Sequence, residues 1–177
     1  PLSFPFLAYA SFCLARGALG KPDGWAVSAL AGTLMMLLDV VIDPLAVRGD
    51  RWFLGRVFYY AEPGAYFGVP LANFVGWLLV GCAIVAGYLW AVSRRPRSLG
   101  SPSGGIGLYY GVLGFNLALA GWIGEWRLLG VGILVHVAVI LVLCPAKIVS
   151  AAWDWAAALR QGARGAAATT VTDEGGF

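Results

Sequence analysis

The stretch WAVSALAGTLMMLLDVVIDP, residues 25–44, decides the fold of this chain. It is long and apolar enough to cross a bilayer as a helix, which takes about 20 residues. Yet the run ends on Asp39 and Asp43, whose i,i+4 spacing places both carboxylates on one helix face. A carboxylate in a membrane-spanning helix costs on the order of 2.5–3.5 kcal/mol, so such residues are candidates for function.

The composition around this stretch indicates an integral membrane protein. Of 177 residues, 60% are hydrophobic and only 12% are charged, whereas soluble domains carry about 25% charged residues. Five apolar runs predict an all-α, polytopic bundle of transmembrane helices, at roughly 2–19, 25–47, 68–92, 106–123 and 128–144. The net charge of +3 comes from Lys and Arg at the ends of these runs. Topology and lipid headgroups explain that pattern better than nucleic acid, which we exclude as a partner.

The positive charges also predict an orientation in the cell membrane. One side of the predicted topology carries eight of them, Arg16, Lys21, Arg94, Arg95, Arg97, Lys147, Arg160 and Arg164. The opposite side carries the other four, Arg48, Arg51, Arg56 and Arg127. The positive-inside rule therefore places the C-terminus in the cytoplasm. We expect a transmembrane domain over residues 1–147, and an interfacial helix and disordered tail over 148–177. Because Pro1 already lies in an apolar run, we also expect further helices upstream.

The cysteines and the single histidine do not form the pattern of a metal site. Cys13, Cys82 and Cys144 lie singly in apolar runs, as small buried hydrophobic residues do. His136 lies in the middle of the fifth run, where a helix-packing or hydrogen-bonding role is expected. Neither a metal nor a cofactor is expected. Glu125 and Arg127 are expected to pair at the membrane interface.

The residues that follow the aspartates indicate a polar pocket. Pro44 should end or bend the helix at Asp43 and free backbone groups, which at membrane depth need protein or a polar cavity. Residues 48–67 are too polar to span but rich in aromatic side chains, so we expect them to lie at the interface or fold back over a pocket. In the next helix, Asn73 and Trp77 share a face, and Asn73 needs a hydrogen-bonding partner such as the aspartates.

This set of residues has a structural and a chemical interpretation. The aspartates could pair with Arg48, Arg51 or Arg56 and hold helices together. Alternatively, a carboxyl group kept from water can hold a proton near neutral pH and deliver it to a substrate. Protonation of an isolated alkene gives a carbocation, which aromatic faces stabilise, and a second carboxylate can activate the water that captures it.

The same residues resemble a known family. Asp39-x-x-x-Asp43-Pro44, the aromatic stretch near Trp52, and Tyr66-Phe67-Gly68-Val69-Pro70 followed by Asn73-Phe74-x-Gly76-Trp77 are similar to the CruF-type carotenoid biosynthesis family of membrane carotenoid hydratases, which includes bacterioruberin-pathway enzymes. The opening PLSFPFLAYASFCLA resembles the segment that leads into this region in the family.

The resemblance implies a cofactor-independent hydratase, a lyase of isoprenoid metabolism that adds water to the terminal double bond of an acyclic carotenoid. It makes Asp39 and Asp43 the acid–base candidates, with Glu62 as a weaker third. Its substrate-binding candidates are Trp52, Tyr59, Tyr60, Tyr66, Asn73 and Trp77. Its partners would be the carotenoid, membrane lipids and other enzymes of the pathway. The alternative is a non-catalytic membrane protein, either a transporter's substrate-binding component or an assembly subunit.

Overall fold

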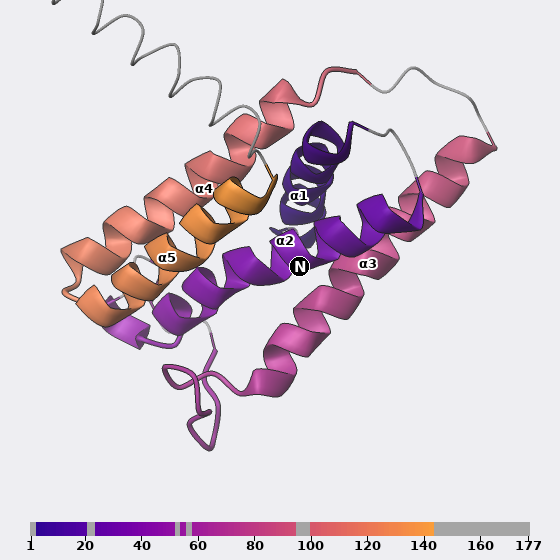
Figure 1. The fold of residues 1–177 in the computed structure, drawn as a ribbon. Coiled ribbons are helices and arrows are strands. Elements are labelled where there is room, and N and C mark those ends of the chain that lie inside the picture. Colours follow the sequence, from indigo (N-terminus) through magenta and orange to yellow (C-terminus); the bar gives the residue numbers. More distant parts are fainter. Residues whose placement is uncertain (1–2, 21–23, 52–53, 56–57, 95–99, 144–177) are drawn as a thin grey trace, which may run out of the picture. The chain divides into compact units, whose positions relative to one another are not determined.

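The computed structural model describes residues 3–20, 24–51, 54–55, 58–94 and 100–143. Over these ranges the chain is helical and forms no β-strand, which confirms the predicted all-α class (Figure 1). The elements are α1 (Ser3–Leu19), α2 (Trp25–Ala46), the short 3₁₀ helix η1 (Gly49–Arg51), α3 (Leu71–Ser93), α4 (Ser103–Trp122) and α5 (Trp126–Leu143). The five predicted apolar runs thus correspond to the five α-helices, with boundaries that differ by a few residues.

Four of these helices, α2 to α5, are long and apolar enough to cross a membrane. α1, with 17 residues, is shorter. Large apolar side chains remain exposed along the helices, including Leu79 on α3 (62% exposed) and Leu134 on α5 (71% exposed). Trp25 and Trp122, at two helix ends, are also exposed. Apolar flanks with tryptophans at their ends are typical of a multi-pass membrane protein.

The chain divides into two compact units, residues 1–137 and 138–177. Of the second unit the structure describes only residues 138–143, which form the end of α5. The interfacial helix and tail predicted for 148–177 lie outside the described residues, as do Arg56 and Cys144. All the contacts discussed below belong to the first unit.

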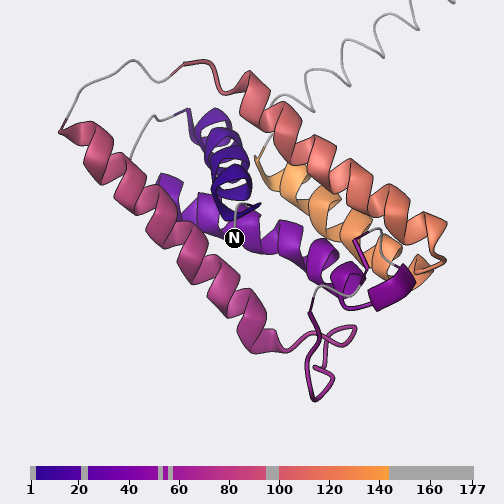
Figure 2. The same cartoon turned by 180° about the vertical axis from the view of Figure 1, so that it is seen from behind.

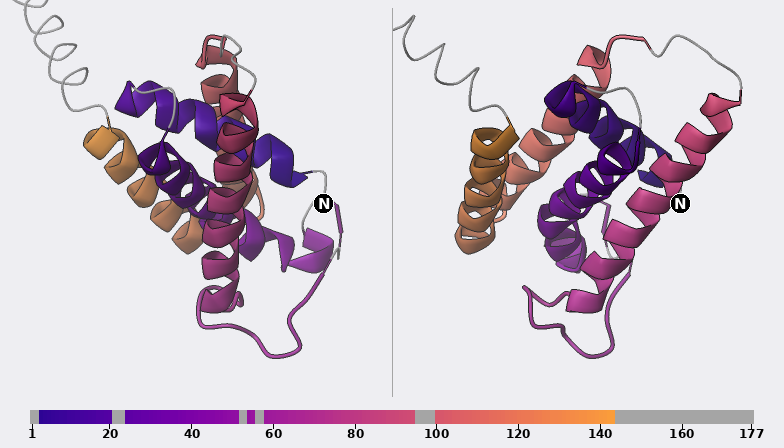
Figure 3. Two further views of the ribbon diagram at one scale, coloured as in Figure 1. Left: turned by 90° about the vertical axis from the view of Figure 1, so that its right-hand side faces the viewer. Right: turned by 45° about the vertical axis from the view of Figure 1, so that its right-hand side comes forward.

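Within the first unit, α2 contacts α1, α3 and α4 (Figure 3). Its contact with α3 is close because glycines meet there. A Cβ atom added to Gly81 would lie 2.9 Å from the Cα of Gly32, closer than real Cβ atoms approach other heavy atoms. Small residues at helix contacts are typical of membrane bundles, where packing replaces the hydrophobic effect as the driving force.

Pro44 was predicted to end or bend the helix at Asp43. The helix does not end there, because α2 continues through Pro44 to Ala46. Pro44 lacks only one backbone N–H, and the N–H of Val47 still bonds to the carbonyl of Asp43 at 3.0 Å. Leu45 and Ala46 are fully packed, with at most 1% of their surface exposed. The burial of this last turn offsets the unfavourable helical conformation before proline.

Candidate functional site

The centre of the candidate site is a pair of carboxyl groups joined by one amide. The side-chain nitrogen of Asn73 donates to Oδ2 of Asp39 at 2.9 Å and to Oδ2 of Asp43 at 2.7 Å. An amide has two N–H donors, so each carboxyl group receives one. Asp39 is completely buried and Asp43 is 6% exposed. The structure therefore brings these three predicted residues together, with both carboxyl groups buried and Asn73 partly exposed.

The backbone explains how residues of two helices meet. α2 presents Asp39 and Asp43 one turn apart, near its C-terminal end. The chain then reverses in a tight loop that is closed by bridges between Gly64 and Gly68 and between Tyr66 and Val69 (Figure 2). Gly68 takes a φ of 92°, which is favourable for glycine alone. α3 starts right after Pro70, so Asn73 occupies its first turn, beside the aspartates.

A cavity of about 730 Å³ opens beside this carboxyl–amide group. Asp43, Asn73 and Trp77 line it together with aromatic side chains from two other segments. These aromatic residues are Phe4 and Phe6 of α1, and Phe58 and Tyr60 of the loop before α3. Trp77 lies one turn after Asn73 on the same face of α3 and lines the cavity together with Asp43. The prediction that residues 48–67 fold back over a pocket is thus met by Phe58 and Tyr60.

Among the cavity residues, Tyr60 interacts electrostatically with the two carboxyl groups. Burial raises the pKa of Tyr60 above its ordinary value of 10.0, and negative charge on the neighbouring pair of Asp43 and Asp39 raises it further. The phenol therefore keeps its proton throughout the physiological range and can act as a hydrogen-bond donor in the cavity.

Other predicted site residues lie elsewhere. Tyr59 is 73% exposed, Glu62 is exposed as well, and neither lines the cavity. Tyr66 does not line the cavity; its ring packs edge-on against Phe74, with centroids 5.3 Å apart. Its hydroxyl is buried and has no hydrogen-bond partner among the described residues. Trp52 lies outside the part of the chain that the structure describes.

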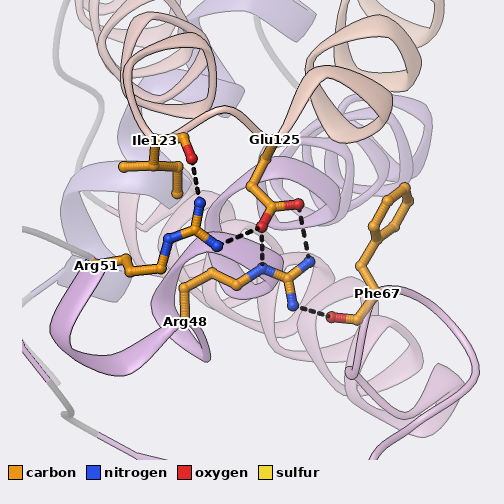
Figure 4. A network of polar contacts seen from close by, with 5 residues as sticks. All are labelled: Arg48, Arg51, Phe67, Ile123 and Glu125. Atoms are coloured by element: carbon orange, nitrogen blue, oxygen red, sulfur yellow. Dashed lines mark hydrogen bonds and ion pairs between the residues drawn. The ribbon is translucent and has the colours of Figure 1, made fainter.

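Among the described residues, Arg48 and Arg51 form their ion pairs with Glu125 and not with the aspartates; Figure 4 shows the contacts of Glu125. Arg48 lies with Nε 3.0 Å from Oε1 of Glu125, and also donates to the carbonyl of Phe67 at 3.3 Å. Arg51 lies 3.3 Å from the same carboxylate and donates to the carbonyl of Ile123. The alternative in which described arginines neutralise Asp39 and Asp43 is therefore wrong. These arginines instead fasten the end of α2 to the corner between α4 and α5.

The predicted pair of Glu125 with Arg127 is also not found among the described ion pairs. Residues two apart do not face each other on a helix, and α5 begins at Trp126. Glu125 therefore points to the arginines that follow α2.

Sequence reasoning missed the contribution of α1 to the cavity. Ser3, Phe4, Phe6 and Leu7 line it, and the ring of Phe4 stacks on Trp77 with centroids 4.5 Å apart. The sequence offered no clear signal for this, because most side chains of α1 are apolar and several of its faces could have turned inward. Only the packing of α1 on α2 and α3 selects the face.

No metal site is formed by the described residues, which contain no group of three or more His, Cys, Asp or Glu side chains able to hold an ion. The Nδ1 atom of His136 lies 2.9 Å from the carbonyl oxygen of Gly132 in its own helix, as a hydrogen-bonding role predicts. Its ring packs near that of Tyr109, with centroids 6.2 Å apart. The predicted packing role of His136 thus agrees with its position.

The fold and site define a helical, multi-pass membrane protein with a paired carboxyl group at an aromatic cavity. Over residues 1–146 the sequence matches the family described as carotenoid biosynthesis proteins. The chain belongs to this family, and the resemblance found in its motifs is confirmed.

One curated relative is a bisanhydrobacterioruberin hydratase from Haloarcula japonica, 33% identical over 144 residues. The match covers 76% of this chain and 47% of the relative, so the chain spans about half the length of that protein. No solved structure matches the chain significantly.

Proposed function

We propose that this chain carries the reaction site of a carotenoid hydratase, which adds water to the terminal double bond of an acyclic carotenoid. The observation that carries the proposal is the amide of Asn73, held within 2.9 Å of Asp39 and 2.7 Å of Asp43 at the wall of an aromatic cavity. The family and the name of the curated relative support carotenoid hydration as the reaction.

The proton donor follows from the contact between the two carboxyl groups. Asp39 and Asp43 both accept a hydrogen bond from the same amide nitrogen of Asn73, at 2.9 Å and 2.7 Å, so the two carboxyl groups lie next to each other. Like charges this close do not both ionise away from water. We assign the transferred proton to Asp43, because Asp43 lines the cavity. Asp39 is completely buried and does not line the cavity, so in this proposal it gives no proton to the substrate directly.

The reaction then proceeds in two balanced steps. The proton moves from the Asp43 carboxyl group to the less substituted carbon of the terminal double bond, and the π electrons form the new C–H bond. The more substituted carbon becomes a tertiary cation. A water oxygen then bonds to this carbon, and the carboxylate takes back one proton of that water. The product is a tertiary alcohol, the acid is restored, and no electron acceptor is needed.

The cavity wall suits the cation. Phe4, Phe58, Tyr60 and Trp77 line the cavity that Asp43 faces. Aromatic faces attract a cation by about 0.5–2 kcal/mol, and more in a site without water. The neutral phenol of Tyr60 supplies a donor that can hold the attacking water. In this mechanism Asn73 positions the carboxyl groups, and Glu62 has no role.

The setting of the site follows from the membrane helices. We place the protein in the cell membrane, with the C-terminus in the cytoplasm, residues 1–147 as the transmembrane domain, and 148–177 as an interfacial helix and tail. An acyclic carotenoid is as apolar as the lipid tails, so it would enter sideways from the bilayer, where other enzymes of the pathway would release it.

Pigment analysis tests the proposal. Expression of the protein in cells that accumulate an acyclic carotenoid should produce a more polar pigment with one added water per modified end, which chromatography and mass spectrometry detect. An unchanged pigment profile, with the protein present in the membrane, would contradict the proposal.

A further inference from the structure

We propose that a second cavity, between α1 and α3, binds the distal hydrocarbon chain of the substrate whose end reacts at Asp43. This inference rests on the proposed function and extends its site. The second cavity has a volume of about 200 Å³. Its walls come from Ala8, Tyr9 and Phe12 of α1 and from Ile84, Val85 and Tyr88 of α3.

The two cavities lie along the same pair of helices. Phe4 and Trp77, one from each helix, stack at 4.5 Å and both line the reaction cavity. Farther along the same two helices, Phe12 meets Tyr88 edge-on, with centroids 5.4 Å apart. Both of these residues line the second cavity. The contact between α1 and α3 therefore has residues of the reaction cavity at one point and residues of the second cavity farther along.

Residues of α3 that line the two cavities lie on one face of the helix. Asn73 and Trp77 in the first cavity are followed by Ile84 and Tyr88 in the second. Steps of four and seven residues keep all four on one side of a helix. With a rise of 1.5 Å per residue, the distance from Asn73 to Tyr88 is about 22 Å. This row of four residues would allow about 22 Å of an extended hydrocarbon chain to lie along α3.

The chemistry of the walls selects the occupant. No charged side chain lines the second cavity, and the hydroxyl groups of Tyr9 and Tyr88 are the only polar side-chain groups among its lining residues. None of these lining side chains would anchor a phosphate or carboxylate headgroup, and the Arg16 guanidinium beside the cavity lies over the ring of Phe12, 5.4 Å from its centroid. An apolar cavity on the same pair of helices as the site for an alkene end suits the rest of the same molecule, a long acyclic polyene.

A pair of matched variants tests this assignment. Ile84→Phe narrows the second cavity, whereas Leu79→Phe places the same ring on an exposed position of α3 that lines neither cavity. Binding is measured on the purified chain in detergent micelles, from the absorbance shift of a long acyclic carotenoid. A short acyclic isoprenoid with the same terminal double bond is measured by competition. Hydration of both compounds is followed in parallel.

We expect Ile84→Phe to weaken binding of the long polyene about tenfold, the usual effect of a misfit in an apolar pocket, and to leave the short compound unchanged. Leu79→Phe should change neither. Equal binding of the long polyene by Ile84→Phe and wild type would overturn the assignment, as would equal loss of both compounds. So would displacement of the polyene by added phospholipid, because the second cavity would then be a lipid site. Length-selective binding by a wild-type chain that hydrates nothing would contradict the proposed function alone.

Discussion

The side-chain amide of Asn73 donates a 2.7 Å hydrogen bond to Asp43, which lies 30 residues earlier in the sequence. This contact joins the first turn of α3 to the last turns of α2, next to the cavity. The same nitrogen holds Asp39, so that one amide fixes the geometry of both carboxyl groups. The proposed proton transfer depends on this arrangement.

Replacement of Asn73 by leucine should remove both donors and misplace the carboxyl groups. Hydration should fall on the order of a hundredfold, as it does when catalytic groups shift by about 1 Å. Unpaired acceptors should also destabilise the fold by about 1–3 kcal/mol. Product formation and thermal unfolding in detergent measure the two effects. The matched control is Asn116→Leu, since the side chain of buried Asn116 donates to the carbonyl of Val112 in its own helix. Similar loss of hydration in both variants would argue against a specific role of Asn73.

Asp43→Asn should abolish hydration and leave membrane expression intact, because an amide keeps the shape of the side chain but carries no acidic proton. Loss of general acid catalysis reduces rates by about 10²–10⁴-fold. Asp39→Asn should also reduce the rate, through loss of the shared proton. Glu62→Gln provides the contrast, since Glu62 is exposed and lines no part of the cavity. A large loss in Glu62→Gln, with full activity in Asp43→Asn, would reverse the assignment.

Glu125→Gln should loosen the corner between α4 and α5, because Arg48 and Arg51 both pair with this carboxylate. The Arg48 and Glu125 side chains are 24% and 20% exposed, so solvent screening limits the expected loss to about 1 kcal/mol. Differential scanning fluorimetry measures the change. Arg127→Gln removes a neighbouring charge outside the described ion pairs and should have little effect. If Arg127→Gln were the more destabilising variant, the pairing would be incorrect.

Gly81→Ala should destabilise the contact between α2 and α3, since its new Cβ would lie 2.9 Å from the Cα of Gly32. Overpacking of this kind costs about 1–3 kcal/mol. Gly87→Ala, on the same helix, adds a methyl group with no atom within 4 Å and should be neutral or slightly stabilising, because alanine favours helix. The midpoint of thermal unfolding in detergent distinguishes the Gly81→Ala and Gly87→Ala variants. Equal stability of the two variants would contradict the close packing at Gly81.

Much of the fold follows from the apolar runs, because each helix must satisfy its own backbone in lipid and therefore occupies one continuous run. For the site, the sequence allowed prediction of which residues share one face of a helix. The spacing of Asp39 and Asp43, and of Asn73 and Trp77, placed each pair on one face, and the need of Asn73 for a partner suggested the contact that is observed.

Contacts between distant segments could not be predicted in this way. Glu125 could have paired with any nearby arginine, and only the packing of the corner between α4 and α5 brings it to Arg48 and Arg51. The inward face of α1 carries no pattern in an apolar helix, so Phe4 was missed. Local preference was also overruled at Pro44, where burial of the final turn keeps α2 helical.

The origin of the product's hydroxyl oxygen tests the central claim most directly. The reaction is run in isotopically labelled water under ordinary dioxygen, and the hydroxylated carotenoid is analysed by mass spectrometry. Hydration through Asp43 predicts that the label enters the tertiary hydroxyl group. An unlabelled hydroxyl group, with label transferred instead from dioxygen in the reverse experiment, would contradict the mechanism.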